Sequence, residues 1–187
     1  IYDMSYRTKT YLAGDWDGDR DLINKLHEWN DSKRLALNFT DVHDLTSSSD
    51  NSYNCSIKRS LRQRLNLCKT FVLIVGKYTK GLRSGSCALC SNYRKGLYEI
   101  APYCYSSSCN TIDYRSYVDY ECEMALKDYN EGKLKNIVVI YNGLLNVDKS
   151  RCPDCLENVG VHIASDTIGA DGTRRWDYQN IKNAISK

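Results

Sequence analysis

The sequence predicts an α/β domain built on a parallel sheet of about five strands, with helices on both faces and a cysteine-rich insertion. Short apolar runs alternate with amphipathic segments, the order in which right-handed crossovers build a parallel sheet. Two runs, 70–76 and 137–141, are continuously apolar, as strands covered on both faces are. The 187 residues, 42% hydrophobic and 26% charged, have a globular composition. We therefore predict a single domain over residues 4–187, with Met4 as the expected natural start and the insertion at 77–115.

The first half of the chain is expected to form three strands and two helices. Apolar residues in the helical segments recur three and four positions apart, which gives each helix one buried stripe. The expected elements are a strand at 8–13, a helix at about 19–30, a strand at 35–42, a polar loop at 44–54, a helix at 55–68 and a strand at 70–76.

The second half begins with the insertion, which is too long to be structureless in a compact domain. A helix is expected to start near Tyr114, followed by the strand at 137–141. The tail is expected to add a strand at 161–164 and a last helix over about 174–186.

Charge and hydropathy exclude several classes of protein. The formal net charge of +3 is small and the basic residues are scattered, which argues against nucleic-acid binding. The sequence has neither a run of 18 apolar residues nor a signal-peptide pattern, so we expect a cytoplasmic protein without membrane contact. It also lacks the glycine-rich signatures of P-loop and Rossmann nucleotide sites.

Polar residues follow the first two predicted strands at their carboxyl ends, where open parallel sheets bind ligands. They are Asp15 and Trp16 after the first strand, and Asp41 and His43 at the end of the second. We predict that all four contact a substrate, with Trp16 stacking on a ring. The alternatives are that Trp16 packs in the core and that His43 bonds the backbone.

The helix after the insertion carries two glutamates of different character. Glu121 falls on the flank of the apolar stripe, whereas Glu123 points nearly opposite. A half-buried carboxylate is costly unless it is paired or used in chemistry. Spacing alone favours an ion pair between Glu121 and a nearby Arg or Lys. The stripe expected to be buried comprises Val118, Cys122, Ala125 and Tyr129.

The nine cysteines suggest metal binding or core packing in a reducing compartment. Two pairs in the insertion, Cys87 with Cys90 and Cys104 with Cys109, suit a structural zinc site that would order it. The pair at 152–155 is a rival contributor, and free thiols are the alternative to zinc. Three further cysteines are expected as small core residues on helices: Cys55, Cys68 and Cys122.

The segment from Tyr117 to Glu121 resembles a family signature. It is similar to the aromatic-x-x-x-Glu motif on the active helix of TIR-domain NADases. The order of strands and helices over residues 8–145 agrees with that family, and is closest to the TIR-like proteins of the Thoeris antiphage system. The chain departs from the family pattern at residues 14–17 and in the cysteine-rich insertion.

The resemblance implies a flavodoxin-like or TIR-like fold and cleavage of NAD at the nicotinamide–ribose bond. Glu121 would be the catalytic residue, with Tyr117 beside the substrate. The product would be an ADP-ribose-type signal that reaches a downstream effector, and the domain would self-assemble. A cyclic isomer is the favoured product, with ADP-ribose itself and a conjugate to another small molecule as the other family outcomes. Two alternatives stay open: a non-catalytic TIR-like scaffold, and an enzyme like the nucleoside deoxyribosyltransferases.

Overall fold

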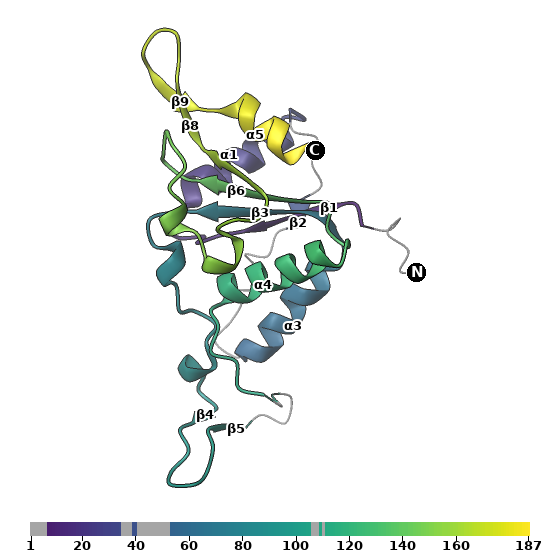
Figure 1. The fold of residues 1–187 in the computed structure, drawn as a ribbon, viewed down its shortest axis with the longest axis vertical. Helices are drawn as coiled ribbons and strands as arrows, with labels where there is room; N and C mark the ends of the chain where they lie inside the picture. Colours follow the sequence, from purple (N-terminus) through teal and green to yellow (C-terminus); the bar gives the residue numbers. More distant parts are fainter. Residues whose placement is uncertain (1–6, 35–38, 41–52, 106–108, 110) are drawn as a thin grey trace.

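The structure is a computed structural model that describes residues 7–34, 39–40, 53–105, 109 and 111–187. Its centre is a five-stranded parallel sheet with the order β2-β1-β3-β6-β7 (Figure 1). This confirms the predicted fold class. The strands are β1 (Lys9–Ala13), β2 (Phe39–Thr40), β3 (Cys68–Val75), β6 (Asn136–Tyr141) and β7 (Val161–Ala164).

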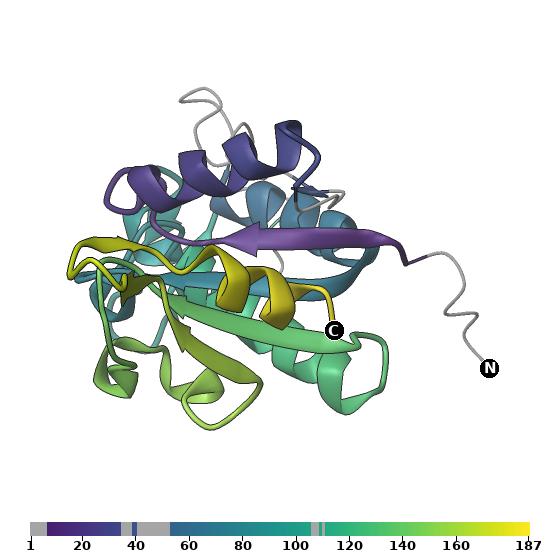
Figure 2. The same cartoon turned by 90° about the horizontal axis from the view of Figure 1, so that it is seen from above.

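Helices cover both faces of this sheet. On one face lie α1 (Arg20–Asp31) and α5 (Tyr178–Ile185), and on the other lie α3 (Asn54–Leu65) and α4 (Tyr117–Asn130). Figure 2, seen from above, shows the strands side by side with their arrowheads toward the same edge. That edge therefore collects the carboxyl ends of the strands, where ligands of such sheets bind.

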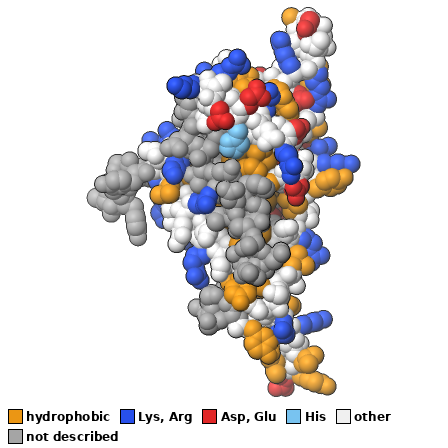
Figure 3. All heavy atoms as spheres, turned by 180° about the vertical axis from the view of Figure 1, so that it is seen from behind, with side chains coloured by type: hydrophobic (Ala, Val, Ile, Leu, Met, Phe, Trp, Pro, Cys, Tyr) orange, Lys and Arg blue, Asp and Glu red, His pale blue; other side chains and the backbone are white. Residues whose placement is uncertain are grey.

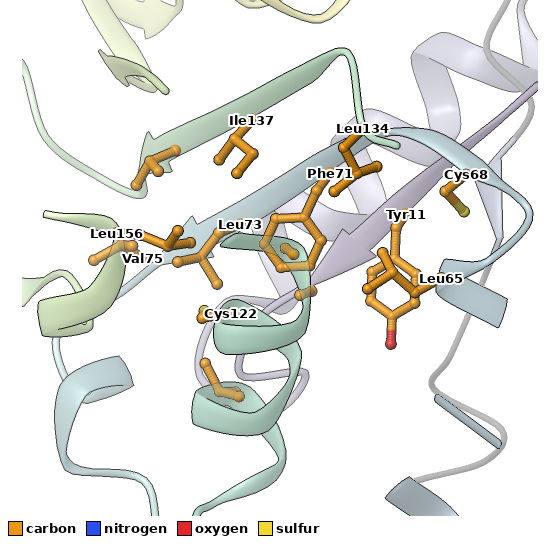
Figure 4. Packing of buried hydrophobic residues seen from close by; sticks show 14 of the residues in the cluster. Tyr11, Leu65, Cys68, Phe71, Leu73, Val75, Cys122, Leu134, Ile137 and Leu156 are labelled. Carbon is orange, nitrogen blue, oxygen red and sulfur yellow. The ribbon is translucent and has the colours of Figure 1, made fainter. Parts of the chain in front are cut away.

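The central strand β3 divides the apolar core into two layers because successive side chains point to opposite faces. Phe71, Leu73 and Val75 belong to the layer under α3 and α4, which Figure 4 shows from close by. Val72 and Ile74 belong to the layer under α1 and α5. All five are fully buried, so each layer anchors the helices above it.

The predicted insertion contains short elements that extend away from the sheet (Figure 1). Two 3₁₀ turns come first, η2 (Thr79–Gly81) and η3 (Cys87–Leu89). An antiparallel pair follows, β4 (Tyr93–Arg94) with β5 (Tyr103–Cys104). We call residues 91–105, which hold this pair and its loop, the arm.

Two expectations at element ends were wrong. Cys68 was expected on a helix but opens β3, where it stays in the core and its thiol donates to the Arg64 carbonyl at 3.3 Å. The last helix was expected from residue 174, but Arg174–Trp176 form strand β9, antiparallel to β8 (Asp166–Ile168). The hairpin forms there, and α5 starts later because Asp177 caps it by accepting from the Asn180 N–H at 3.2 Å.

Beyond β6 the chain makes two more 3₁₀ turns, η4 (Lys149–Arg151) and η5 (Asp154–Leu156), before entering β7. The predicted strand at 161–164 is confirmed. Within the described part of the chain, no helix combines the length and apolar character that crossing a bilayer requires.

Candidate functional site

Glu121 is a buried acid in the layer between the sheet and α4. It is 5% exposed, and the Tyr11 hydroxyl donates a 2.6 Å hydrogen bond to its Oε1 atom. Tyr11 comes from the middle of β1 and stacks on Phe71 of β3 with ring centroids 5.5 Å apart. In Figure 4 the Tyr11 hydroxyl points away from the sheet. One strand and one helix, distant in sequence, thus place a phenol against a carboxylate.

The surroundings of Glu121 disfavour its charge. Burial raises its pKa from 4.5 to about 7, and the hydrogen bond from Tyr11 opposes that rise only in part. The ion pair that spacing alone favours is not found, since no Lys or Arg of the described residues makes a salt bridge to Glu121. A carboxyl group with this pKa is close to half ionised at neutral pH.

The helix that carries Glu121 is held firmly at its start. Ser116 caps α4 by accepting from the Asp119 N–H at 3.0 Å. Lys58 of α3 is buried and donates to the Arg115 carbonyl at 2.7 Å, while its ammonium lies 3.2 Å from Asp113. Because α3 holds the segment directly before α4, the position of Glu121 is fixed by contacts that lie five to eight residues before it.

The second glutamate behaves as predicted. Glu123 is exposed, and the Arg115 guanidinium donates to it at 2.5 Å. On the buried stripe, Val118, Cys122 and Ala125 are confirmed as core. Tyr129 is not, since it is 39% exposed, and Asp128 takes the buried position beside it.

Tyr117 is half-buried at the first turn of α4, and its hydroxyl donates to Asn54 Oδ1 at 3.0 Å. Its ring covers Gly85, which has a φ of 98°, and a Cβ atom there would lie 2.5 Å from the ring. Burial, and then nearby cysteines, raise the pKa of Tyr117 to about 12. Its described contacts are structural, so its predicted role beside the substrate stays a prediction.

Asp15 and Trp16 follow β1 at the carboxyl edge of the sheet, as expected. The Trp16 side chain is half-buried and packs against both core layers, which agrees with the core alternative for this residue. Asp41 and His43 lie outside the described residues. Among the described hydrogen bonds, none joins Glu121 to Asp15 or Trp16.

A second buried acid, Asp19, lies at the same edge. It is 2% exposed, and Asn142, which follows β6, donates to its Oδ1 atom at 2.9 Å. Burial raises its pKa to about 6, against the hydrogen bond from Asn142 and with the help of Asp15 and Asp21. The carboxylate fills the space beside Gly76, where a Cβ atom would lie 2.2 Å from Oδ1.

Sequence reasoning missed both Tyr11 and Asp19 as site residues. Asp19 was taken as an ordinary acid at a helix N-terminus, which favours such residues. A signal was present, because Asp19 directly precedes a helix that leaves the carboxyl end of β1. For Tyr11 the signal was a polar hydroxyl in an otherwise apolar run.

Two of the four predicted zinc ligands, Cys104 and Cys109, interact through their thiols. Cys87 is buried and its thiol accepts from the Asp113 N–H at 3.3 Å, whereas the Cys109 thiol donates to the Thr111 carbonyl at 3.5 Å. Burial, and then the neighbouring Cys104 and Cys55, raise the pKa of Cys109 to about 12. Within the described ranges no three His, Cys, Asp or Glu residues are placed to hold a metal. The zinc site predicted for Cys87, Cys90, Cys104 and Cys109 stays a prediction.

The strand order and the two helical layers define a flavodoxin-like α/β domain of the kind that TIR-like domains have. Residues 4–84 match the model of the family described as Thoeris protein ThsB, TIR-like domain. The predicted resemblance to the TIR-like proteins of the Thoeris system is confirmed over these residues, which make up less than half of the chain. The match ends before α4, so the role of Glu121 depends on its geometry and its motif. None of the curated proteins matches the chain.

Proposed function

We propose that this protein cleaves the nicotinamide–ribose bond of NAD, with Glu121 as the catalytic carboxylate. The observation that carries the proposal is the environment of Glu121. It is a buried acid that no described cation neutralises, held by one phenol, on a helix whose start is fixed. A carboxylate costs stability in such a place, and that cost is explained if the charge is used in chemistry.

The chemistry of NAD suits a single carboxylate. The C1′–N bond breaks with both electrons moving to the pyridinium nitrogen, so nicotinamide leaves neutral and needs no general acid. The ribose becomes oxocarbenium-like, as in glycoside hydrolysis. An ionised Glu121 would stabilise this positive charge most strongly where water is excluded.

Tyr11 would position this carboxylate and favour its charged form. Its O–H donates to Oε1, and the other carboxylate oxygen would face the substrate. Without this bond the pKa of Glu121 would be higher still, and a smaller fraction would be ionised at neutral pH. Asp15 and Trp16, with Asp41 and His43, would bind other parts of the dinucleotide at the sheet edge.

The fate of the ribose determines the product. Attack by water at C1′, with loss of one proton, gives ADP-ribose. Attack by a group of the adenosine half gives a cyclic isomer, and we favour this outcome because a Thoeris signal must reach a separate effector. The reaction would take place in the cytoplasm, where the thiols of this cysteine-rich chain stay reduced.

NAD turnover by the purified protein, beside Glu121→Gln, tests the proposal. Glu123→Gln is the matched control, because it removes an exposed acid from the same helix. Nicotinamide release and product masses are measured at high protein concentration, with and without lysate from phage-infected cells. We expect release by the wild type and by Glu123→Gln, and a loss of about 100-fold or more in Glu121→Gln.

Two results would contradict the proposal. Equal nicotinamide release by wild type and Glu121→Gln would remove Glu121 from the chemistry. No release under any condition would favour the scaffold. A parallel assay with a 2′-deoxynucleoside and a free base tests the transferase alternative, because base exchange in place of nicotinamide release would assign the same acid to that reaction.

A further inference from the structure

The arm ends in an apolar tip that the rest of the described chain leaves uncovered. Leu97 is 70% exposed, Tyr98 fully exposed and Ile100 63% exposed. Tyr103 and Tyr105 continue this surface toward the domain, with ring centroids 5.6 Å apart. In Figure 3 hydrophobic and basic side chains, with an acidic one among them, lie at the lower end of the molecule. Several large apolar side chains exposed together indicate an interaction site.

The tip has a defined shape. Gly96 lies so close to Ile100 that a Cβ atom would come within 1.7 Å of its carbonyl oxygen. The Ile100 N–H donates to the Leu97 carbonyl at 3.1 Å, which closes the turn. Tyr98 has a φ of 56°, a conformation that non-glycine residues rarely adopt. The backbone thus presents Leu97, Tyr98 and Ile100 outward in a fixed turn.

The opposite end of the molecule carries an open hollow of about 410 Å³ between the loop after β6, strand β8 and the start of α5. Three of its apolar residues are exposed, namely Leu145 (41%), Val147 (40%) and Ile168 (52%). A cavity of about 150 Å³ already holds a benzene ring, so this volume suits an aromatic and an aliphatic side chain together.

The charges of the two surfaces are opposite. Asp166 and Asp177 line the hollow, and its lining contains no Lys or Arg. Asp166 is already paired with Arg174, which lies at 2.5 Å, so Asp177 is the freer carboxylate. Arg94 and Lys95 lie directly before the tip turn and outnumber its one acid, the exposed Glu99; the Arg94 guanidinium is 5.0 Å from the Tyr105 ring centroid. A basic, apolar projection and an acidic, partly apolar hollow are complementary.

We propose that the arm of one copy of this chain docks into the hollow of a second copy. Figure 1 draws the longest axis vertically, with the arm at its lower end and the β8–β9 hairpin, next to the hollow, at its upper end. One molecule therefore cannot fill its own hollow. Contacts between two different surfaces are heterologous, and they extend into rings or filaments. This assembly does not depend on NAD chemistry.

Mixing two variants tests both the surfaces and their pairing. The arm variant is Tyr98→Asp and the hollow variant is Ile168→Arg. Leu67→Asp is the matched control, because Leu67 is a similarly exposed apolar residue (46%) away from both surfaces. Molar mass is measured by light scattering over rising protein concentration, and thermal unfolding checks that each variant is folded.

We expect the mass of the wild type and of Leu67→Asp to rise with concentration, and each surface variant to stay monomeric at tenfold higher concentration. An equimolar mixture of the two variants should form a 1:1 dimer and nothing larger, because one intact arm and one intact hollow remain.

A wild type that stays monomeric at every concentration would overturn the proposal. So would a mixture that fails to dimerise while the hollow variant alone still associates, which would assign the arm to an arm–arm contact. Binding to vesicles that contain phosphatidylserine is the last measurement. Arm-dependent sedimentation of a monomeric protein with them would identify the tip as a membrane contact instead.

Discussion

Two buried carboxylates lie on α4, two helical turns apart, and their hydrogen-bond partners differ in charge. Asp128 is fully buried and receives hydrogen bonds from Arg7 at 2.9 Å and from Arg62 at 2.8 and 3.1 Å. Glu121 is 5% exposed and receives one from the neutral hydroxyl of Tyr11. The ion pair that spacing favours for Glu121 is thus found at Asp128.

The contrast separates two uses of a buried acid. The arginines of Asp128 tie the chain before β1 and helix α3 to α4, so this acid holds elements together. Glu121 contributes one hydrogen bond and keeps a costly carboxyl group in an apolar layer. If this distinction is right, removing the first acid should destabilise the fold, and removing the second should stabilise it while stopping the chemistry.

The largest expected effect is the loss of stability in Asp128→Asn. Two arginines would lose their counter-charge, at a cost of about 3 kcal/mol, the lower end for a broken buried pair because both guanidinium groups reach some solvent. Urea unfolding measures this change. Glu123→Gln is the control and should shift stability by less than about 0.5 kcal/mol. If Asp128→Asn also changed the free energy of unfolding by less than about 0.5 kcal/mol, the ion pairs of Asp128 with Arg7 and Arg62 would not be needed for stability.

Glu121→Gln should raise the free energy of unfolding, and the size of this gain should depend on pH. The folded pKa of about 7 lies above the unfolded value of 4.5, so the wild type loses stability as pH rises between them. Above pH 7 burial of the charged carboxylate lowers the unfolding free energy of the wild type by about 3 kcal/mol, whereas the variant has no such loss. Unfolding free energies of both proteins at pH 4 and pH 8 give the difference. A pH-independent difference would contradict the buried charge.

The fold was predictable from local patterns, because a continuously apolar strand such as β3 and the stripe of α1 need only the next element to cover them. The residues at which helices and strands begin and end were less predictable. Cys68 fits a helix by spacing, but its pairing with Lys9 places it in β3. Residues 174–176 follow the turn pair Asp171-Gly172, a hairpin signal that sequence reasoning missed, and they pair with β8.

The site was predictable only in part. Helical spacing puts Glu121 on the flank of a buried stripe, and the structure confirms its burial. Spacing cannot identify its partner, because Tyr11 lies 110 positions away and faces Glu121 only once β1 and α4 are packed. Asp19 and Asn142 meet for the same reason, at the edge where β1 and β6 both end.

The next smaller expected effect is on the rate of NAD cleavage, which should rise with pH as Glu121 ionises. With the pKa of Glu121 at about 7, kcat/KM should rise about tenfold between pH 6 and pH 8 and then level off. The reason is that only the carboxylate stabilises the oxocarbenium-like transition state. Initial rates of nicotinamide release at low NAD measure the profile. A flat profile over this range would mean that another group limits the reaction.

The smallest expected effect is that of Tyr11→Phe, and it tests whether Tyr11 positions the acid or merely packs. Phenylalanine keeps the stack on Phe71 but removes the 2.6 Å hydrogen bond that lowers the pKa of Glu121. The midpoint of the pH profile should then move up by about one unit, with a loss of about fivefold in kcat/KM at pH 7 that recovers at higher pH. Packing alone would lower the rate equally at every pH, so an unshifted midpoint would limit Tyr11 to a structural part.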